Sequence, residues 1–249
     1  LKGVTPLSPT FDHVGLLAAD VITTKKVFSA LIGNEQNFPP ILISGLRIGI
    51  IPWHFNIPEL EKEVADSVKM TIEKLKTLGA SVVEIDDSVF KELEKTFEAI
   101  LLFEAWEIHG EKVASNPAHF GPETLRLLLT ASETTKEQYE SAFNRRKELL
   151  PLAAHIYDSI DVIITPAAPY VAPATTPPID TPEGAVEGIY TSIFNITGDP
   201  AIVIPIGLNS DGLPIGIQLA TIKGSDLNLL SIAQAIENTL DLKLIPTIS

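Results

Sequence analysis

Residues 190–200 set hydroxyl and amide side chains among apolar ones, directly before an apolar run. They read Tyr-Thr-Ser-Ile-Phe-Asn-Ile-Thr-Gly-Asp-Pro, so Tyr190, Thr191 and Asn195 are candidates for contact with a ligand. Buried polar groups need hydrogen-bond partners and can simply tie loops together. Ligand sites of α/β proteins, however, collect beside the ends of strands. The residues alone leave both interpretations open.

Two pairs of side chains have spacings that chemistry can use. His155 and Asp158 share a helix face at i, i+3, which suits metal ligands, although an exposed polar pair is the commoner arrangement. Glu104 and Glu107 have the same spacing and could do acid/base work, but partly solvated helix glutamates are far more frequent. We therefore predict no metal site and no cofactor.

The sequence excludes several classes of function. It contains no G-x-S-x-G elbow, no phosphate loop, no G-x-G-x-x-G after a strand and no H-E-x-x-H. The absence of cysteine excludes disulfides and cysteine nucleophiles. A net charge of −14 argues against binding to nucleic acid, since phosphate contacts need clustered Lys and Arg. No apolar run approaches the roughly 20 residues that span a bilayer. A reducing cytosol is the default compartment for a sequence without cysteine, so we expect a cytoplasmic protein.

The first third of the chain predicts a βαβ unit after an irregular lead-in over residues 1–19. A helix is expected over residues 22–31 and a strand over residues 46–51. A long amphipathic helix follows, capped by Asn56 and closed by Gly79, and then a strand over residues 81–85. Such a unit makes two parallel strands with a right-handed crossover.

Residues 90–160 are predicted to be helical. Thr135 followed by Gln138 suits a capping box at the start of one helix. Pro151 is expected to kink or break that helix. Residues 166–182 are rich in Pro, Ala and Thr, and we favour a rigid loop over the sheet edge rather than a linker between domains.

The last third predicts the centre of the sheet. An Asn-Ser-Asp-Gly turn joins two apolar runs into a hairpin, because Asp-Gly supplies the positive φ that the turn needs. A final helix is expected to be capped near Ser225. Continuous apolar strands are covered on both faces. We therefore predict three neighbouring central strands, at residues 162–165, 201–207 and 215–221.

Several of these segments resemble the amidase signature family. Residues 191–201, 204–207 and 211–219 are similar to its T-x-P-x-N-x-T-G-x-P-A stretch, its P-x-G turn and its D-G-L-P-x-G-x-Q-L stretch, with the same spacing. Weaker similarities follow in the family's order at residues 6–15, 46–49, 74–83 and 161–166. The resemblance covers nearly the whole chain.

The resemblance implies an α/β fold, a mixed central β-sheet surrounded by α-helices, with residues 1–249 as the C-terminal part of one amidase domain. It also implies a serine hydrolase that cleaves amides with a Ser–cis-Ser–Lys triad, through an acyl-enzyme and an oxyanion loop. Those residues lie upstream of Leu1 in the family's pattern, and this sequence has no Gly-Gly-Ser-Ser-Gly stretch. No residue here is predicted to be catalytic.

The expected partners are a small-molecule amide and an N-terminal amidase segment, or a companion chain, carrying the Ser-Ser-Lys triad. The start, which lacks a methionine, reads like the middle of a longer protein, and a homodimer stays open. The mean hydropathy of +0.23 fits either a large core or a fragment whose apolar face meets another piece. This chain alone is expected to be inactive and to expose that face.

The predicted substrate site combines the polar stretch with more distant side chains. Tyr190, Thr191 and Asn195 are expected near the mouth of a cleft. The side chains expected to join them are Tyr170, Trp106 and Arg126, of which the arginine interrupts an apolar run and could hold a substrate carboxylate.

Departures from the family's pattern keep two alternatives open. Residues 16–19 read Leu-Leu-Ala-Ala where relatives often have Pro-Leu-Ala-Arg, and Thr23 replaces a common Asp. Residues 187–189 read Glu-Gly-Ile, without the Asp that amidotransferase subunits of the A type carry in this region. The alternatives are an amidotransferase A-type subunit, which this departure disfavours, and a non-catalytic amidase-like binding homologue.

Overall fold

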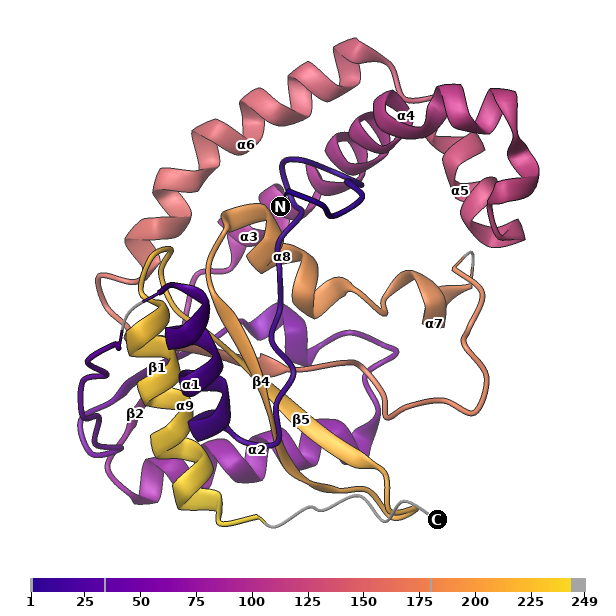
Figure 1. The fold of residues 1–249 in the computed structure, drawn as a ribbon. Coiled ribbons are helices and arrows are strands. Elements are labelled where there is room, and N and C mark those ends of the chain that lie inside the picture. The colour runs from indigo at the N-terminus through magenta and orange to yellow at the C-terminus, as the bar shows by residue number, and fades with distance from the viewer. Residues whose placement is uncertain (1, 34, 180, 243–249) are drawn as a thin grey trace. The chain divides into compact units, whose positions relative to one another are not determined.

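The computed structural model of the chain describes residues 2–33, 35–179 and 181–242 (Figure 1). Its elements in chain order are α1 (Val21–Leu31), β1 (Arg47–Ile50), η1 (Pro52–Phe55), α2 (Lys62–Thr77), β2 (Ser81–Glu84), α3 (Ser88–Glu94), α4 (Phe97–Ser115), η2 (Pro117–His119), α5 (Pro122–Ala131), α6 (Lys136–Ile156), β3 (Val162–Pro166), α7 (Pro182–Ala185), α8 (Ile189–Thr197), β4 (Ala201–Leu208), β5 (Pro214–Ala220) and α9 (Asp226–Leu240). None of the helices so described is long and apolar enough to cross a membrane.

The strands of the described chain form one mixed sheet in the order β2-β1-β3-β5-β4. β1 pairs in parallel with β2 and with β3, whereas β5 pairs antiparallel with β3 and with β4. One hydrophobic cluster unites this sheet with α2 and α9, and α1 packs on α9. The predicted α/β class, the βαβ unit and the hairpin are confirmed.

The three strands predicted to be central differ in their positions. All five residues of β3 are buried, and β5 lies between β3 and β4, as predicted. The prediction for residues 201–207 is wrong, because β4 lies at the edge of the described sheet, where Val203 and Leu208 are 53% and 50% exposed. An apolar run shows that a strand has apolar surface to cover, but not which neighbour covers it.

The helix α2 begins later than its sequence suggests. Asn56 does not cap it, because its amide group donates to the carbonyl oxygen of Pro52 at 2.7 Å and closes η1. The N-cap is Glu61, whose backbone N–H donates to the carbonyl oxygen of Pro169 at 2.8 Å. The apolar face is as predicted, since its buried residues include Val64 and Val68.

The two local signals in α6 have different outcomes. The capping box is confirmed: the Thr135 N–H donates to the Gln138 side chain at 2.8 Å, and the Gln138 N–H donates to the Thr135 hydroxyl at 3.2 Å. Pro151 does not break the helix, which continues to Ile156.

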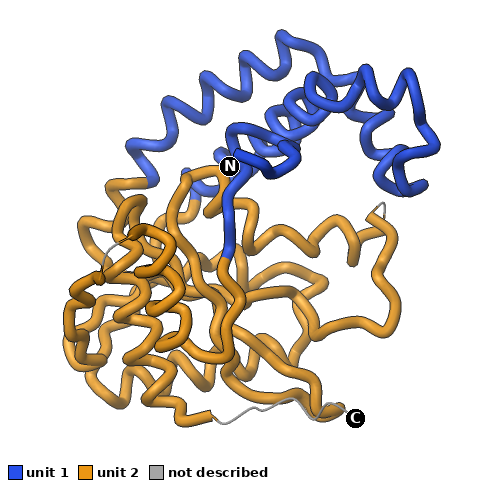
Figure 2. Tube along the Cα trace, viewed as in Figure 1, with its two compact units in different colours: residues 1–15, 88–153 blue, residues 16–87, 154–249 orange. Residues whose placement is uncertain are grey.

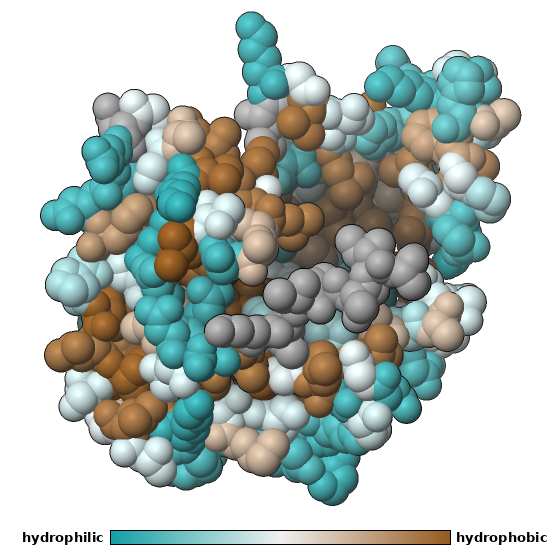
Figure 3. All heavy atoms as spheres, turned by 60° about the horizontal axis from the view of Figure 1, so that its bottom comes forward, coloured by the Kyte–Doolittle hydropathy of each residue, from teal (hydrophilic) through white to brown (hydrophobic). Residues whose placement is uncertain are grey.

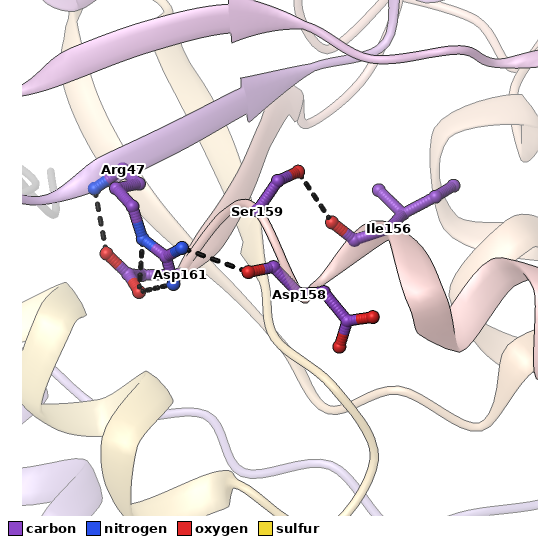
Figure 4. Close-up of polar contacts among 5 residues, drawn as sticks. All are labelled: Arg47, Ile156, Asp158, Ser159 and Asp161. Atoms are coloured by element: carbon purple, nitrogen blue, oxygen red, sulfur yellow. Dashed lines mark hydrogen bonds and ion pairs between the residues drawn. The ribbon is translucent and has the colours of Figure 1, made fainter.

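An ion pair joins the starts of β1 and β3 (Figure 4). The Arg47 guanidinium donates to Asp161 Oδ1 at 2.6 and 3.1 Å, and the Arg47 N–H donates to Asp161 Oδ2 at 2.8 Å. The same guanidinium also donates to the carbonyl oxygen of Asp158 at 3.0 Å. Burial raises the pKa of Asp161, but the hydrogen bonds and charge of Arg47 outweigh it and lower that pKa overall. The pair fixes the register of two parallel strands.

The chain divides into two compact units (Figure 2). The helical unit comprises residues 1–15 and 88–153, and contains α3 to α5 and most of α6. The sheet unit comprises residues 16–87 and 154–249, and contains all five strands that the structure describes. A single amidase domain over residues 1–249 stays a prediction.

Candidate functional site

The polar stretch before β4 folds as α8. Its C-terminal residue is followed by Gly198, which has a φ of 75° and whose N–H donates to the carbonyl oxygen of Phe194 at 2.8 Å. Glycine reaches this left-handed conformation without the penalty that a Cβ imposes. The chain then turns into β4, so α8 stands immediately beside the sheet.

Tyr190 anchors the first turn of α8 in the core. Its side chain is fully buried, and its hydroxyl donates to the carbonyl oxygen of His54 at 2.9 Å. Its ring meets the His54 ring edge-on, with centroids 4.9 Å apart. Burial raises the pKa of the phenol well above its ordinary value. The structure thus assigns Tyr190 to the core rather than to the mouth of a cleft, because every part of its side chain is enclosed or bonded.

Thr191 and Asn195 lie together on an accessible side of α8. The Thr191 hydroxyl is exposed and donates to the carbonyl oxygen of Gly188 at 3.1 Å. Asn195 is half-buried, one turn later, and its amide group donates to the carbonyl oxygen of Thr191 at 3.3 Å. Both side chains therefore keep free hydrogen-bonding capacity toward one side of the helix.

Tyr170 lies in the loop that follows β3. Its hydroxyl donates to the carbonyl oxygen of Glu183 at 2.9 Å. Glu61 makes two hydrogen bonds to the same loop. Its N–H donates to the carbonyl oxygen of Pro169, and its carboxylate accepts the Val171 N–H at 3.2 Å. The loop is thus tied to the starts of α2 and α7, which supports a rigid loop rather than a linker.

The two remaining predicted site residues belong to the helical unit. Trp106 on α4 packs against a small apolar cluster that α4 forms with α5. Arg126 on α5 is exposed and forms an ion pair with Glu123, three residues earlier in the helix, at 3.0 Å. Because α8 belongs to the sheet unit, the place of Trp106 and Arg126 in a common site with it stays a prediction.

The pair considered for metal binding and the pair considered for acid/base work are not arranged for those roles in the described structure. His155 Nδ1 lies 3.1 Å from an Asp158 carboxylate oxygen with both side chains largely exposed, which is a surface pair. Glu104 is buried whereas Glu107 is exposed, so their carboxylates do not converge.

A buried polar network was not foreseen from the sequence. The Gln218 side-chain amide on β5 donates to the carbonyl oxygen of Tyr190 at 2.6 Å and to the Thr165 hydroxyl on β3 at 3.2 Å. That hydroxyl donates in turn to the carbonyl oxygen of Pro166 at 2.9 Å. The available signal was a glutamine inside a strand that is otherwise apolar. The network joins α8 to the centre of the sheet.

Comparisons with known proteins agree with this architecture. The family model described as Amidase matches residues 1–230. The A-type subunit of the glutamyl-tRNA(Gln) amidotransferase of Acinetobacter baumannii (strain AB0057) is 29% identical over 248 residues, which cover 90% of this chain and 50% of that protein. An amidase of Pseudomonas putida is 28% identical over 232 residues, covering 85% of this chain and 50% of that protein.

A solved crystal structure of an amidase has the same fold. It superposes with a TM-score of 0.82 at 23% identity, covering 94% of this chain and 54% of that chain. The chain spans about half the length of the curated relatives that it matches. Because the family model covers nearly the whole chain, this protein belongs to the amidase family.

Proposed function

We propose that this chain is the later part of an enzyme that hydrolyses the carbon–nitrogen bond of a small-molecule amide. The observation that carries the proposal is the match to the amidase family over residues 1–230, by a chain that spans about half of its curated relatives. Relatives of similar identity include an amidase and a 2-amino-5-chloromuconic acid deaminase of Comamonas testosteroni.

The nucleophile of the complete enzyme comes from a companion segment in this proposal. No Gly-Gly-Ser-Ser-Gly stretch occurs in the sequence, and none of its residues is assigned a place in the Ser–cis-Ser–Lys triad. The companion's serine would attack the amide carbonyl and expel the amine, and water would then hydrolyse the acyl-enzyme. Backbone N–H groups of the companion's loop would stabilise the oxyanion.

This chain contributes the sheet and part of the substrate pocket. Thr191 and Asn195 are the strongest candidates for contact with the substrate, because both are accessible on the same side of α8. Tyr170 is a further candidate on the pinned loop, and Trp106 and Arg126 are candidates from the helical unit. Tyr190 is buried, so in this proposal it holds the first turn of α8 in place rather than contacting the substrate.

The exposed edge of β4 is where we place the companion segment. No strand of the described chain pairs with that edge, and β4 presents Val203 and Leu208 to solvent. Unpaired edges with apolar side chains are normally covered, because they otherwise promote aggregation. Apolar residues form patches on the face of the molecule drawn in Figure 3. Among the exposed apolar residues, Leu17 and Leu42 are 103% and 78% exposed. This surface supports a companion.

An amidotransferase A-type subunit is the second candidate, because several relatives of similar identity carry that name. The Glu-Gly-Ile at residues 187–189 disfavours it, as the family's Asp is missing there. A non-catalytic homologue is the third candidate. The cytoplasmic location expected from the cysteine-free sequence stays a prediction.

One substrate panel separates these candidates. The chain is expressed together with its companion segment, and aliphatic amides, aryl amides and glutamine are offered in parallel while ammonia or amine release is followed. Hydrolysis of simple amides supports the proposed function. Release of ammonia from glutamine alone would replace it with the amidotransferase function, and no turnover of any amide would favour the binding homologue.

A further inference from the structure

Residues 6–12, here called the approach segment, form a tight turn in the helical unit. The Asp12 carboxylate accepts the N–H groups of Leu7 at 3.0 Å and of Ser8 at 3.1 Å. The carbonyl oxygen of Ser8 accepts the N–H groups of Phe11 at 2.9 Å and of Asp12 at 2.7 Å. The segment therefore has a defined shape, although it contains no helix or strand.

A single carboxylate on α4 holds this segment. Glu104 is only 9% exposed, and its Oε2 accepts the Ser8 hydroxyl at 2.5 Å and the Thr10 N–H at 3.0 Å. Its Oε1 accepts the Thr10 hydroxyl at 2.5 Å and the Tyr139 hydroxyl of α6 at 3.3 Å. Both carboxylate oxygens are thus saturated, and three of the four donors belong to the approach segment.

Contacts at both ends extend this attachment. The carbonyl oxygen of Pro6 lies 2.8 Å from His109 Nε2 on α4. The Phe11 ring meets the Phe97 ring of α4 with centroids 5.0 Å apart, and the Arg146 guanidinium of α6 lies 5.7 Å from the centroid of the Phe11 ring. Phe97, Glu104 and His109, about one to two turns apart on α4, therefore contact the segment in the reverse of its own chain order.

The buried carboxylate of Glu104 is better explained by the arrangement that its hydrogen bonds specify than by the filling of space. Removing a carboxylate from water is unfavourable unless its oxygens are hydrogen-bonded, and an apolar side chain of similar size fills space at lower cost. A carboxylate with directed donors from residues about a hundred positions away instead specifies one arrangement of the chain. Glu107, three residues later on α4, is by contrast exposed and makes no hydrogen bond or ion pair among the described residues.

We propose that Glu104 is a positioning residue, which fixes the approach segment on α4 and thereby sets the position of the companion segment's catalytic groups. The proposal rests on the proposed function, in which the companion segment precedes the approach segment. Glu104 itself touches no substrate in this account. It acts through the segment that it holds.

The attachment is tested on the chain as it is, by amide hydrogen exchange. Glu104→Gln keeps the shape of the side chain but replaces one acceptor oxygen with an NH₂ group, which cannot accept the segment's donors. The N–H groups of Ser8 and Thr10 are expected to exchange about tenfold faster or more in Glu104→Gln, while Glu107→Gln leaves them unchanged. Unchanged exchange in Glu104→Gln would overturn the anchoring role.

The positioning role is tested on the complete enzyme with companion segment, well below its unfolding temperature. Glu104→Gln is expected to lower kcat about 100-fold with little change in KM, because a small displacement of reacting groups slows chemistry more than binding. Ser8→Ala combined with Thr10→Val removes two donors from the other side, so it should reproduce the loss and add little to Glu104→Gln. This double variant also serves if Glu104→Gln does not fold.

The outcomes separate this proposal from the proposed function. Faster exchange with unchanged kcat would leave Glu104 as a purely local anchor and overturn its positioning role. A wild-type complete enzyme that hydrolyses no amide would overturn the proposed function and the positioning role together. The exchange measurement would still decide the anchoring, since it needs no activity.

Discussion

The side-chain amide of Gln218 donates to the backbone carbonyl oxygen of Tyr190 over 2.6 Å, and this contact attaches α8 to the middle of the sheet. The same amide group bonds the hydroxyl of Thr165, the residue directly opposite Gln218 on β3. Gln218 is only 3% exposed, so water cannot take its place as the hydrogen-bond partner of these two groups. The helix that carries the candidate substrate contacts therefore depends on a buried amide group.

Replacing Gln218 by methionine should destabilise the chain, because it removes both of these buried hydrogen bonds. A hydrogen bond contributes about 0.5–1.5 kcal/mol net, so the loss of two should lower the free energy of unfolding by about 1–3 kcal/mol. Thr165→Val removes part of the same network, and the double variant should cost less than the sum of the single ones. Urea unfolding measures all three, and strictly additive losses would contradict a shared network.

His54 should make stability depend on pH below neutrality. Its ring is fully buried, and neither ring nitrogen has a hydrogen-bond partner among the described residues. Burial lowers the pKa of His54 from 6.5 to about 3, opposed only in part by the Asp87 carboxylate. The unfolded chain therefore takes up a proton near pH 6.5 that the folded chain refuses until about pH 3. Stability is fully present above pH 6.5 and is lost as the pH falls through this window.

The His54→Phe variant isolates that contribution. Relative to the wild type, its free energy of unfolding should rise by about 1.4 kcal/mol for each pH unit below 6.5, because the variant has no imidazole to protonate. Urea unfolding at pH 7.5, 6 and 5 measures the difference and cancels the titration of carboxylates common to both. Parallel pH profiles for the two proteins would show that His54 is not held neutral.

The accessible side of α8 should affect catalysis more than stability. In the complete enzyme, Thr191→Val and Asn195→Ala should each lower kcat/KM about tenfold, the effect of one lost hydrogen bond to the substrate. Thr77→Val is the matched control, because Thr77 is also exposed near a helix end and its hydroxyl also donates to the carbonyl oxygen three residues earlier. Equal kcat/KM in all four proteins would remove α8 from the substrate site.

Local signals in the sequence predicted most of the elements. The capping pair Thr135 and Gln138, the Asp-Gly turn before Leu213 and the apolar face of α2 each involve residues close together in the chain. Their hydrogen bonds and packing follow from helix and turn geometry, which is the same in any protein. The parallel βαβ unit and the antiparallel hairpin together indicated a mixed sheet, and the family pattern agreed with it.

Long-range partners could not be predicted in this way. Spacing marked Glu104 as one of a pair with Glu107, whereas three of its four donors belong to Ser8 and Thr10, more than 90 positions away. The same limit applies to Tyr190, whose hydroxyl bonds His54 across 136 positions. Periodicity also failed to separate the edge strand β4 from the central β5, since both are apolar.

The central claim is that the catalytic groups lie outside this chain while the chain completes their enzyme. The most direct test measures amide hydrolysis by the purified chain alone and mixed with the companion segment that carries a Gly/Ser-rich loop. The chain alone should show no turnover, because loss of the catalytic unit costs about 10⁶-fold in kcat, and mixing should restore hydrolysis. Turnover by the chain alone at a rate typical of enzymes would contradict the account.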